Sequence, residues 1–110
     1  MAGVALGRDA FHGLQDLKRE KVDLPGRGGF IWIREMCAEE ILQFFEKSKA
    51  DSSGTMVWLM AKSVVDESGE RLFSDAEAGL LAQSLNREEF RLIQDKVLAI
   101  NGIGEEAEKK

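Results

Sequence analysis

Hydrophobic and polar positions alternate over residues 18–24 and again over residues 30–34. The alternating apolar side chains are Val22, Leu24, Ile31 and Ile33. A period of two residues is typical of a strand that buries one face. The segment 25–29 between the two runs is Pro-Gly-Arg-Gly-Gly, in which proline fixes one φ and glycine permits the positive φ of a tight loop. The pattern therefore predicts a β-hairpin over residues 18–34.

Beyond the hairpin, the spacing of apolar residues changes to the three- and four-residue steps of a helix. The clearest stripe consists of Phe90, Ile93, Val97 and Ile100. The run from Thr55 to Val65 is apolar on almost every face, which is typical of a helix that is central or covered by a partner. We predict helices at about 38–48, 55–65, 75–85 and 87–101.

Capping patterns support the starts of three of these helices. The segments Ser74–Glu77 and Asn86–Glu89 have the spacing of a capping box, in which each end residue's side chain bonds the backbone N–H of the other. The segment Cys37–Glu40 repeats this spacing before the first predicted helix. A thiol is a weak hydrogen-bond acceptor, so we expect the cap at Cys37 to be poor.

The predicted elements together define an α+β fold, with an N-terminal β-hairpin packed on a small bundle of about four α-helices. A hairpin alone is marginal in water, so one of its faces must pack on the helices. We expect a partly flexible N-terminal segment at 1–16 and a single α+β domain at 17–103. Residues 104–110 contain nothing to bury and are predicted to form a disordered tail.

The chain has 110 residues, the usual size of one domain, of which 44% are apolar and 32% charged. Its charge is unevenly distributed. Residues 1–34 contain six basic and four acidic side chains, whereas residues 35–110 contain nine basic and sixteen acidic ones, a net charge of −7 within a total of −5. An anionic surface repels a phosphate backbone, so we expect no nucleic-acid partner and favour a protein partner.

Several features predict a cytosolic protein with no membrane partner. The longest uninterrupted apolar run, Met56–Ala61, is far shorter than the ~20 residues that a membrane-spanning helix needs. The apolar start of the chain lacks a basic lead-in and is interrupted by Arg8 and Asp9, unlike a signal peptide. Cys37 is the single cysteine, so no internal disulfide can form.

Few residues suit catalysis or metal binding. A nucleophile needs a base within hydrogen-bond reach, and the chain offers one cysteine and one histidine, Cys37 and His12. His12 lies in a glycine-flanked stretch that we expect to fray, so we interpret Cys37 as a semi-buried structural thiol. These two residues cannot supply the usual tetrahedral shell of zinc. We therefore predict no enzymatic activity, no cofactor and no metal.

Two segments resemble ion-binding motifs only in part. Residues 66–77 place Asp66 and Glu77 at the first and twelfth positions of a calcium loop, but Arg71 occupies the sixth position, where the bend needs glycine. An ordinary turn followed by a helix cap explains the same residues. A phosphate cradle must lead from a strand into a helix, whereas the glycine-rich segment 26–29 leads into a predicted strand. We interpret it as a hairpin turn.

The predicted helices at 75–85 and 87–101 leave open an alternative function, that of a small helix-turn-helix DNA-binding regulator. The second helix would present Arg87, Glu88 and Glu89 to a groove walled by phosphates. Carboxylates are unfavourable there, and the later basic residues of the helix do not offset them.

The first two predicted helices carry more apolar side chains than one small core can take. Either both helices are buried centrally, or part of their surface is exposed and binds a partner. Methionine and aromatic side chains suit a surface that accepts varied apolar segments, because thioethers repack easily and rings bury large areas. The candidate partner-binding residues are Leu42, Phe44, Phe45, Trp58 and Met60.

Three segments of the chain, taken in order, resemble the tail assembly chaperones of long-tailed bacteriophages and prophages. Residues 17–40, with the hairpin and an Arg-Glu pair before the first helix, are similar to the opening of that family. Residues 64–74 resemble its turn of acidic residue, glycine, Leu-Phe and helix cap, and residues 97–102 resemble its closing helix. Cys37 departs from the pattern, because a serine or threonine cap is expected at that position.

The resemblance implies a protein that binds the long, helical tape measure protein in the host bacterial cytoplasm and keeps it soluble during tail assembly. It also implies that the chaperone is absent from the mature virion. Family members are commonly made in a longer form as well, by ribosomal frameshifting, and such a form could bind the tail tube protein. The codons of the last residues, Glu108, Lys109 and Lys110, can contain a run of adenines.

Two further interpretations stay open at this point. The apolar surplus also suits a generic protein-interaction adaptor, with a client that the residues do not identify. The same surface could pair two copies of the chain as a homo-oligomer when no client is present.

Overall fold

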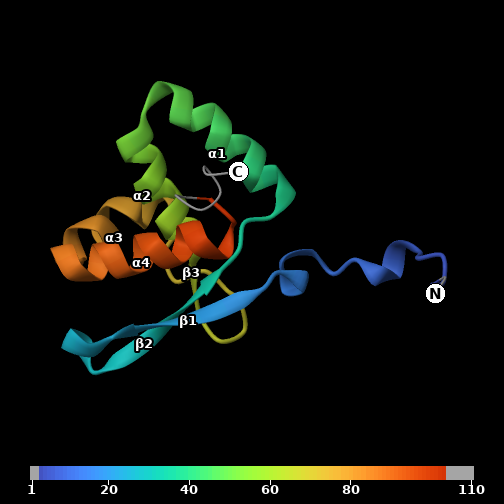
Figure 1. Ribbon diagram of the computed structural model, residues 1–110, viewed down its shortest axis with the longest axis horizontal. Coiled ribbons are helices and arrows are strands. Elements are labelled where there is room, and N and C mark those ends of the chain that lie inside the picture. Colours follow the sequence, from blue (N-terminus) through green and yellow to red (C-terminus); the bar gives the residue numbers. More distant parts are fainter. Residues whose placement is uncertain (1–2, 104–110) are drawn as a thin grey trace.

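A computed structural model of the chain describes residues 3–103 (Figure 1). In this range it combines a three-stranded antiparallel sheet with four α-helices, so the predicted α+β class is confirmed. The segment 104–110, predicted to be a disordered tail, lies outside the described residues.

The predicted hairpin is present. Strands β1 (Arg19–Leu24) and β2 (Gly29–Arg34) pair antiparallel and are joined by a 3-10 turn at Pro25–Arg27. Gly28 ends this turn with a φ of 72°, a conformation that glycine adopts without strain. Alternate residues of both strands face the helices, as period two requires.

A third strand, β3 (Val64–Val65), was not predicted. It pairs with the edge of β2 that lies opposite β1. The expectation of a helix through Val65 is therefore wrong at its end, because the helix stops at Ser63. Both valines are buried, and a strand buried on two faces has no polar alternation. In sequence, β3 resembles the end of a buried helix. It forms a strand because it pairs with the neighbouring edge of β2.

Helices α1 (Ala38–Ala50) and α2 (Ser52–Ser63) meet at a single residue, Asp51. The Asp51 carboxylate accepts a hydrogen bond from the Gly54 N–H at 3.0 Å and so caps α2. The polar segment around Asp51 is therefore a sharp corner between two helices, and α2 begins at Ser52 rather than near Thr55.

The predicted helix at 75–85 is a 3-10 turn at Asp75–Glu77 followed by α3 (Ala78–Ser84). Helix α4 (Arg87–Ile100) lies close to its predicted range. Its capping box is confirmed, since the Glu89 N–H donates to Asn86 Oδ1 at 2.8 Å and the Asn86 N–H donates to Glu89 Oε1 at 3.2 Å.

The core lies between the sheet and helices α2, α3 and α4. Helix α4 packs on β1, β2 and α2, whereas α1 packs mainly on α2. The Met36 N–H donates to Asn101 Oδ1 at 2.7 Å, which ties the start of α1 to the end of α4. The buried core side chains are Val22, Leu24, Ile33, Met36, Phe44, Leu59, Met60, Ala61, Val64, Leu81, Ile93 and Val97.

Residues 3–18, called the arm below, precede β1 and run away from the rest of the molecule (Figure 1). The arm contains two short 3-10 turns, Arg8–Ala10 and Gly13–Asp16. It joins the body at Lys18, whose N–H donates to Glu35 Oε2 at 2.7 Å and whose carbonyl accepts from the Glu35 N–H at 2.9 Å.

Candidate partner-binding surface

A buried ion pair fixes the orientation of α1. Arg34, at the end of β2, is only 2% exposed, and its Nη1 and Nη2 donate to the two carboxylate oxygens of Glu40 at 2.7 and 2.8 Å. Glu40 Oε1 also accepts from the Cys37 N–H at the start of the helix. Burial alone would raise the pKa of Glu40, but the hydrogen bonds and charge of Arg34 hold it below its ordinary value. Glu40 therefore faces inward as a carboxylate.

The inward position of Glu40 turns two large apolar side chains of α1 outward. Leu42 is 72% exposed and Phe45 is 55% exposed. They are three residues apart, so they lie one above the other on the same side of the helix. We call these two residues the α1 surface.

Phe44 supports the α1 surface from below. It lies four residues after Glu40 and is buried in the core beneath α1. Its ring meets that of Phe45 edge to face, with centroids 5.6 Å apart and planes at 67°. The contact restricts the exposed Phe45 ring, so less rotamer freedom is lost when a partner covers it.

Trp58 of α2 lies on a neighbouring flank of α1 and is half-buried. The ammonium groups of Lys47 and Lys62 lie 5.4 and 5.3 Å from its ring centroid, within cation–π range. Two hollows border the ring, of about 430 and 320 Å³, and both are lined by Trp58 and Lys47. This flank is mixed in charge, since Glu46 and Asp75 line the larger hollow together with the lysines.

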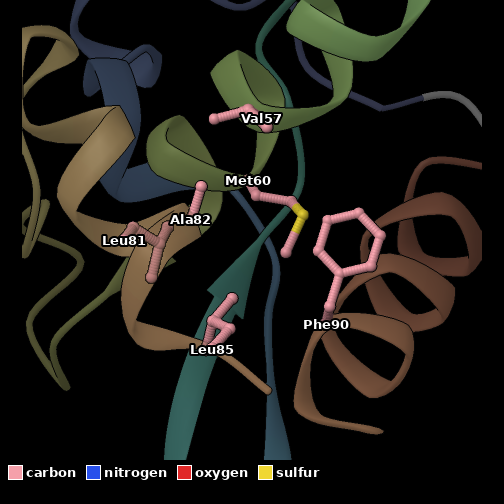
Figure 2. Close-up of a pocket in the computed structure, with 6 residues that line it drawn as sticks. All are labelled: Val57, Met60, Leu81, Ala82, Leu85 and Phe90. Carbon is pink, nitrogen blue, oxygen red and sulfur yellow. The ribbon is translucent and has the colours of Figure 1, made fainter. Parts of the chain in front are cut away.

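Met60 lies inside the molecule, where α2, α3 and α4 meet. Figure 2 shows its sulfur directed at the ring of Phe90, with Leu81 and Leu85 on the other side of a narrow apolar crevice. Met60 is 2% exposed, so a partner on the surface of the folded protein does not reach it.

The five residues predicted to bind a partner thus have three different locations. Leu42 and Phe45 lie together on the outside, Trp58 borders the adjacent hollows, and Phe44 and Met60 belong to the core. The prediction is corrected for the last two, because folding buries them against the sheet and the other helices. Leu42, Phe45 and Trp58 remain as candidates for partner binding.

Sequence reasoning missed several exposed or surface-forming residues. The lysines beside Trp58 were not considered, although Lys62 follows Trp58 by four residues on one helix and is therefore its neighbour. Other large apolar side chains that are exposed among the described residues are Val4, Leu6, Phe11, Phe30, Leu72 and Leu80. Those in the arm are scattered without periodicity, so no pattern drew attention to them.

The residues considered for chemistry are engaged in local structure. The His12 N–H donates to Asp16 Oδ2 at 2.8 Å, and the ring Nδ1 lies 3.1 Å from Asp16 Oδ1. Cys37 is partly buried at the start of α1.

Within residues 3–103, no three His, Cys, Asp or Glu side chains are grouped so that they could hold a metal ion. No helix in the same range is long and apolar enough to cross a membrane.

The segment that partly matched a calcium loop forms an ordinary turn. Asp66 Oδ1 accepts hydrogen bonds from the Ser68 N–H, the Ser68 hydroxyl and the Glu70 N–H at 2.8, 2.6 and 3.0 Å. These bonds lower the pKa of Asp66, and the bond from the Ser68 hydroxyl contributes most. Glu77 accepts from the Ser74 N–H as a helix cap. Both carboxylates thus serve the local backbone.

The start of α4, which would be the reading helix of a DNA-binding motif, is docked on the hairpin. Arg27 in the hairpin turn donates from Nε and Nη2 to the carboxylate of Glu89 at 2.8 and 3.0 Å. The hydrogen bonds from Arg27 and from the Asn86 N–H lower the pKa of Glu89, so it is charged at neutral pH. The first turn of α4 is therefore docked on the hairpin, and its other carboxylate, Glu88, favours no contact with a phosphate backbone.

No family model and no curated protein matches the sequence. Among solved structures, the chain is similar to the tail assembly chaperone of bacteriophage HK97, with a TM-score of 0.64 and 19% sequence identity. The match covers 89% of this chain and 94% of that chain. A likeness at this identity concerns the fold. Over most of its length, then, the chain has the fold of a phage tail assembly chaperone.

Proposed function

We propose that the protein is a tail assembly chaperone of a long-tailed phage or prophage, which binds the tape measure protein and keeps it soluble in the host cytoplasm. The observation that carries the proposal is the shared fold with the HK97 tail assembly chaperone over 89% of the chain. The sequence resemblance to that family, made of the hairpin, the 64–74 turn and the closing helix, points in the same direction. In this role the protein leaves the tail before the virion is complete.

The α1 surface suits a helical client. Leu42 and Phe45 project outward one turn apart, so the apolar stripe of a client helix can pack across both. Each fully buried side chain of this size contributes about 1.5–3 kcal/mol. Two such side chains give weak binding once the loss of translational freedom is included. A long client would therefore be held by many copies of the chaperone, each with a modest affinity.

Co-expression with the tape measure protein tests the proposal. The client is identified from the gene neighbourhood as a very long, helix-rich reading frame. We expect Phe45→Asp and Leu42→Asp each to shift the client from the soluble fraction to the pellet, because a carboxylate on the α1 surface must be desolvated in the complex. The soluble fraction of the client is measured on gels.

Leu80→Asp is the matched control, since Leu80 is also 55% exposed but lies on α3. It should leave the client soluble, and circular dichroism should show all three variants folded. A client that stays soluble with Phe45→Asp and Leu42→Asp would contradict the role of the α1 surface. A wild-type chaperone that never changes client solubility would contradict the proposed function itself.

We also propose that a longer form of the chaperone arises by ribosomal frameshifting and binds the tail tube protein. The support is the family resemblance and the terminal Glu-Lys-Lys, residues 108–110, whose codons can contain a run of adenines. The nucleotide sequence of codons 104–110 decides this point. A run of adenines broken by other bases, with no overlapping reading frame downstream, would refute it.

A further inference from the structure

Two lysines from neighbouring helices converge on the ring of Trp58. Lys47 of α1 and Lys62 of α2 place their Nζ atoms 5.4 and 5.3 Å from the ring centroid. Both lysines line the hollow of about 430 Å³ beside the ring, which we call the Trp58 hollow. The Lys62 side chain is only 16% exposed, so water screens its charge less than that of a lysine on the open surface. An anion that enters the hollow is therefore attracted by both ammonium groups.

The carboxylate of Asp75 also lines the Trp58 hollow, but two cations share it. Its Oδ1 lies 2.9 Å from Arg71 Nη2 and 3.5 Å from Lys62 Nζ. The hydrogen bond from Arg71 contributes most to the lowered pKa of Asp75, and the charge of Lys62 acts in the same direction. One carboxylate does not neutralise two cations, so this side of the hollow keeps an excess of positive charge.

Lys47 adds a further positive charge on the α1 side of the Trp58 hollow. It takes part in no ion pair among residues 3–103, and the neighbouring Glu46 lies 3.8 Å from Lys49 instead. Within a chain of net charge −5, the hollow and its ion-pair partners thus carry +2. A positive site on an anionic protein favours an acidic partner. The side chains counted are Lys47, Lys49, Lys62, Arg71, Glu46 and Asp75.

The Trp58 hollow adjoins the α1 surface. Gln43 and Glu46 line the hollow, and each follows one of the two exposed residues, Leu42 and Phe45, in sequence. Around the helix, Glu46 and Gln43 lie between Leu42 and Lys47. A helix with its side chains is about 10–12 Å across, so a client helix that packs on Leu42 overhangs this flank. A long side chain at the edge of the client's apolar stripe then reaches the hollow.

We propose that the Trp58 hollow binds a carboxylate side chain, glutamate or aspartate, of the client helix that packs on the α1 surface. The carboxylate lies between the ammonium groups of Lys47 and Lys62, and its aliphatic stem packs on the ring of Trp58. This inference rests on the proposed function, because it takes the client to be helical. The α1 surface accepts apolar side chains in general, whereas the hollow selects client segments with an acidic residue beside the apolar stripe.

Peptides that tile the client sequence, each several helical turns long, test the inference with the purified full-length chaperone. Isothermal titration calorimetry gives the Kd. We expect the peptides that bind to carry a glutamate or aspartate beside their apolar stripe. Replacing that residue by its amide should raise the Kd about two- to fivefold, as for an exposed ion pair. Lys47→Gln should raise the Kd of the acidic peptide by the same factor and leave that of the amide peptide unchanged, because both changes break one contact.

Lys21→Gln is the matched control. Lys21 also lies over a tryptophan, with its Nζ 5.3 Å from the ring centroid of Trp32, but it belongs to the hairpin. The variant has the same net charge as Lys47→Gln and should bind the acidic peptide like the wild type. In about 1 M salt, where the Debye length is about 3 Å, the difference between Lys47→Gln and the wild type should disappear.

Fluorescence shows whether the hollow itself is occupied. The chain has two tryptophans, so Trp32→Phe leaves Trp58 as the single emitter. The emission maximum of Trp58 should shift when the acidic peptide covers the ring, and the shift should be smaller with the amide peptide. An acidic peptide that binds without any shift would place the contact elsewhere and overturn the inference.

The outcomes separate this inference from the proposed function. If every client peptide binds Lys47→Gln as tightly as the wild type, the carboxylate site is refuted and the chaperone role stands. An equal loss for Lys21→Gln would also refute the site, because net charge alone would then explain the effect. If no client peptide binds and the client's solubility never changes, the proposed function fails and the inference fails with it.

Discussion

Helices α1 and α4 begin in the same way but have different surroundings. Each has a glutamate, Glu40 or Glu89, that bonds the N–H of its own cap residue and pairs with an arginine of the hairpin. In α4 the apolar stripe packs inward, and its central residues Ile93 and Val97 are fully buried. In α1 two of the residues that turn outward, Leu42 and Phe45, are apolar as well, yet they remain exposed.

The difference shows that the two helices are held in place by different interactions. Helix α4 is held by its apolar stripe, and its pair with Arg27 is half open to solvent. Helix α1 is held by a buried ion pair and by its contact with α2. Because folding uses only the inner face of α1, the outer face is available for a partner.

The largest effect should come from Glu40→Gln. The change leaves the buried guanidinium of Arg34 without its counter-charge, and we expect a loss of about 3–5 kcal/mol in the free energy of unfolding. Urea denaturation measures this loss. Glu39→Gln, one residue away and exposed, is the matched control and should change stability by less than about 0.5 kcal/mol.

The pH dependence of Glu40→Gln checks the cause. The folded-state pKa of Glu40 is lowered from 4.5, so its contribution is fully present above this pH and is lost as the pH falls through the folded value. The gap between wild type and variant should therefore shrink below pH 4.5. A gap that is constant from neutral pH down to acid unfolding would show that the ion pair is not its source.

An effect of intermediate size is expected in the apolar stripe of α4. Ile93→Ala creates a cavity in the fully buried core, and we expect it to lower the free energy of unfolding by about 2–5 kcal/mol. Leu42→Ala removes a side chain of the same size from the outer face of α1 and should change it by less than about 0.5 kcal/mol. If the two changes prove equally damaging, Leu42 packs on something in the free protein and the contrast between the helices fails.

The smallest of the three effects should follow Arg27→Gln. Arg27 is half-exposed, so water can replace part of the hydrogen bonds that it donates to Glu89. The comparison is made by measuring the Tm of Arg27→Gln and of Glu40→Gln under the same conditions. A loss for Arg27→Gln that equals the loss for Glu40→Gln would mean that the two helices depend on their ion pairs alike.

The sequence predicts this fold well wherever one face of an element is buried. The hairpin and α4 were found because alternation and the helical stripe each mark a buried side. Strand β3 was missed because Val64 and Val65 are buried on both sides, and such a run has no period. Their conformation depends on the edge of β2, which lies some thirty residues earlier in the chain.

The candidate surface was predicted only in part, for a related reason. Phe44 and Phe45 are adjacent, and about 100° of helix rotation decides which of them is buried. The pair of Arg34 with Glu40 sets this rotation, and the sequence does not show that Arg34 is buried. On α2 the apolar residues surround the helix, so nothing distinguished the inward Met60 from the half-exposed Trp58.

The single buried ion pair that orients α1 also bears on how such chains diverge. With Glu40 and Phe44 retained, the outward positions of α1 can change residue by residue while the helix keeps its place. Substitutions at these positions would then leave the rest of the molecule undisturbed. Chains with this pair could differ widely on the outer face of α1 and keep one fold; this chain and the HK97 tail assembly chaperone share a fold at 19% identity.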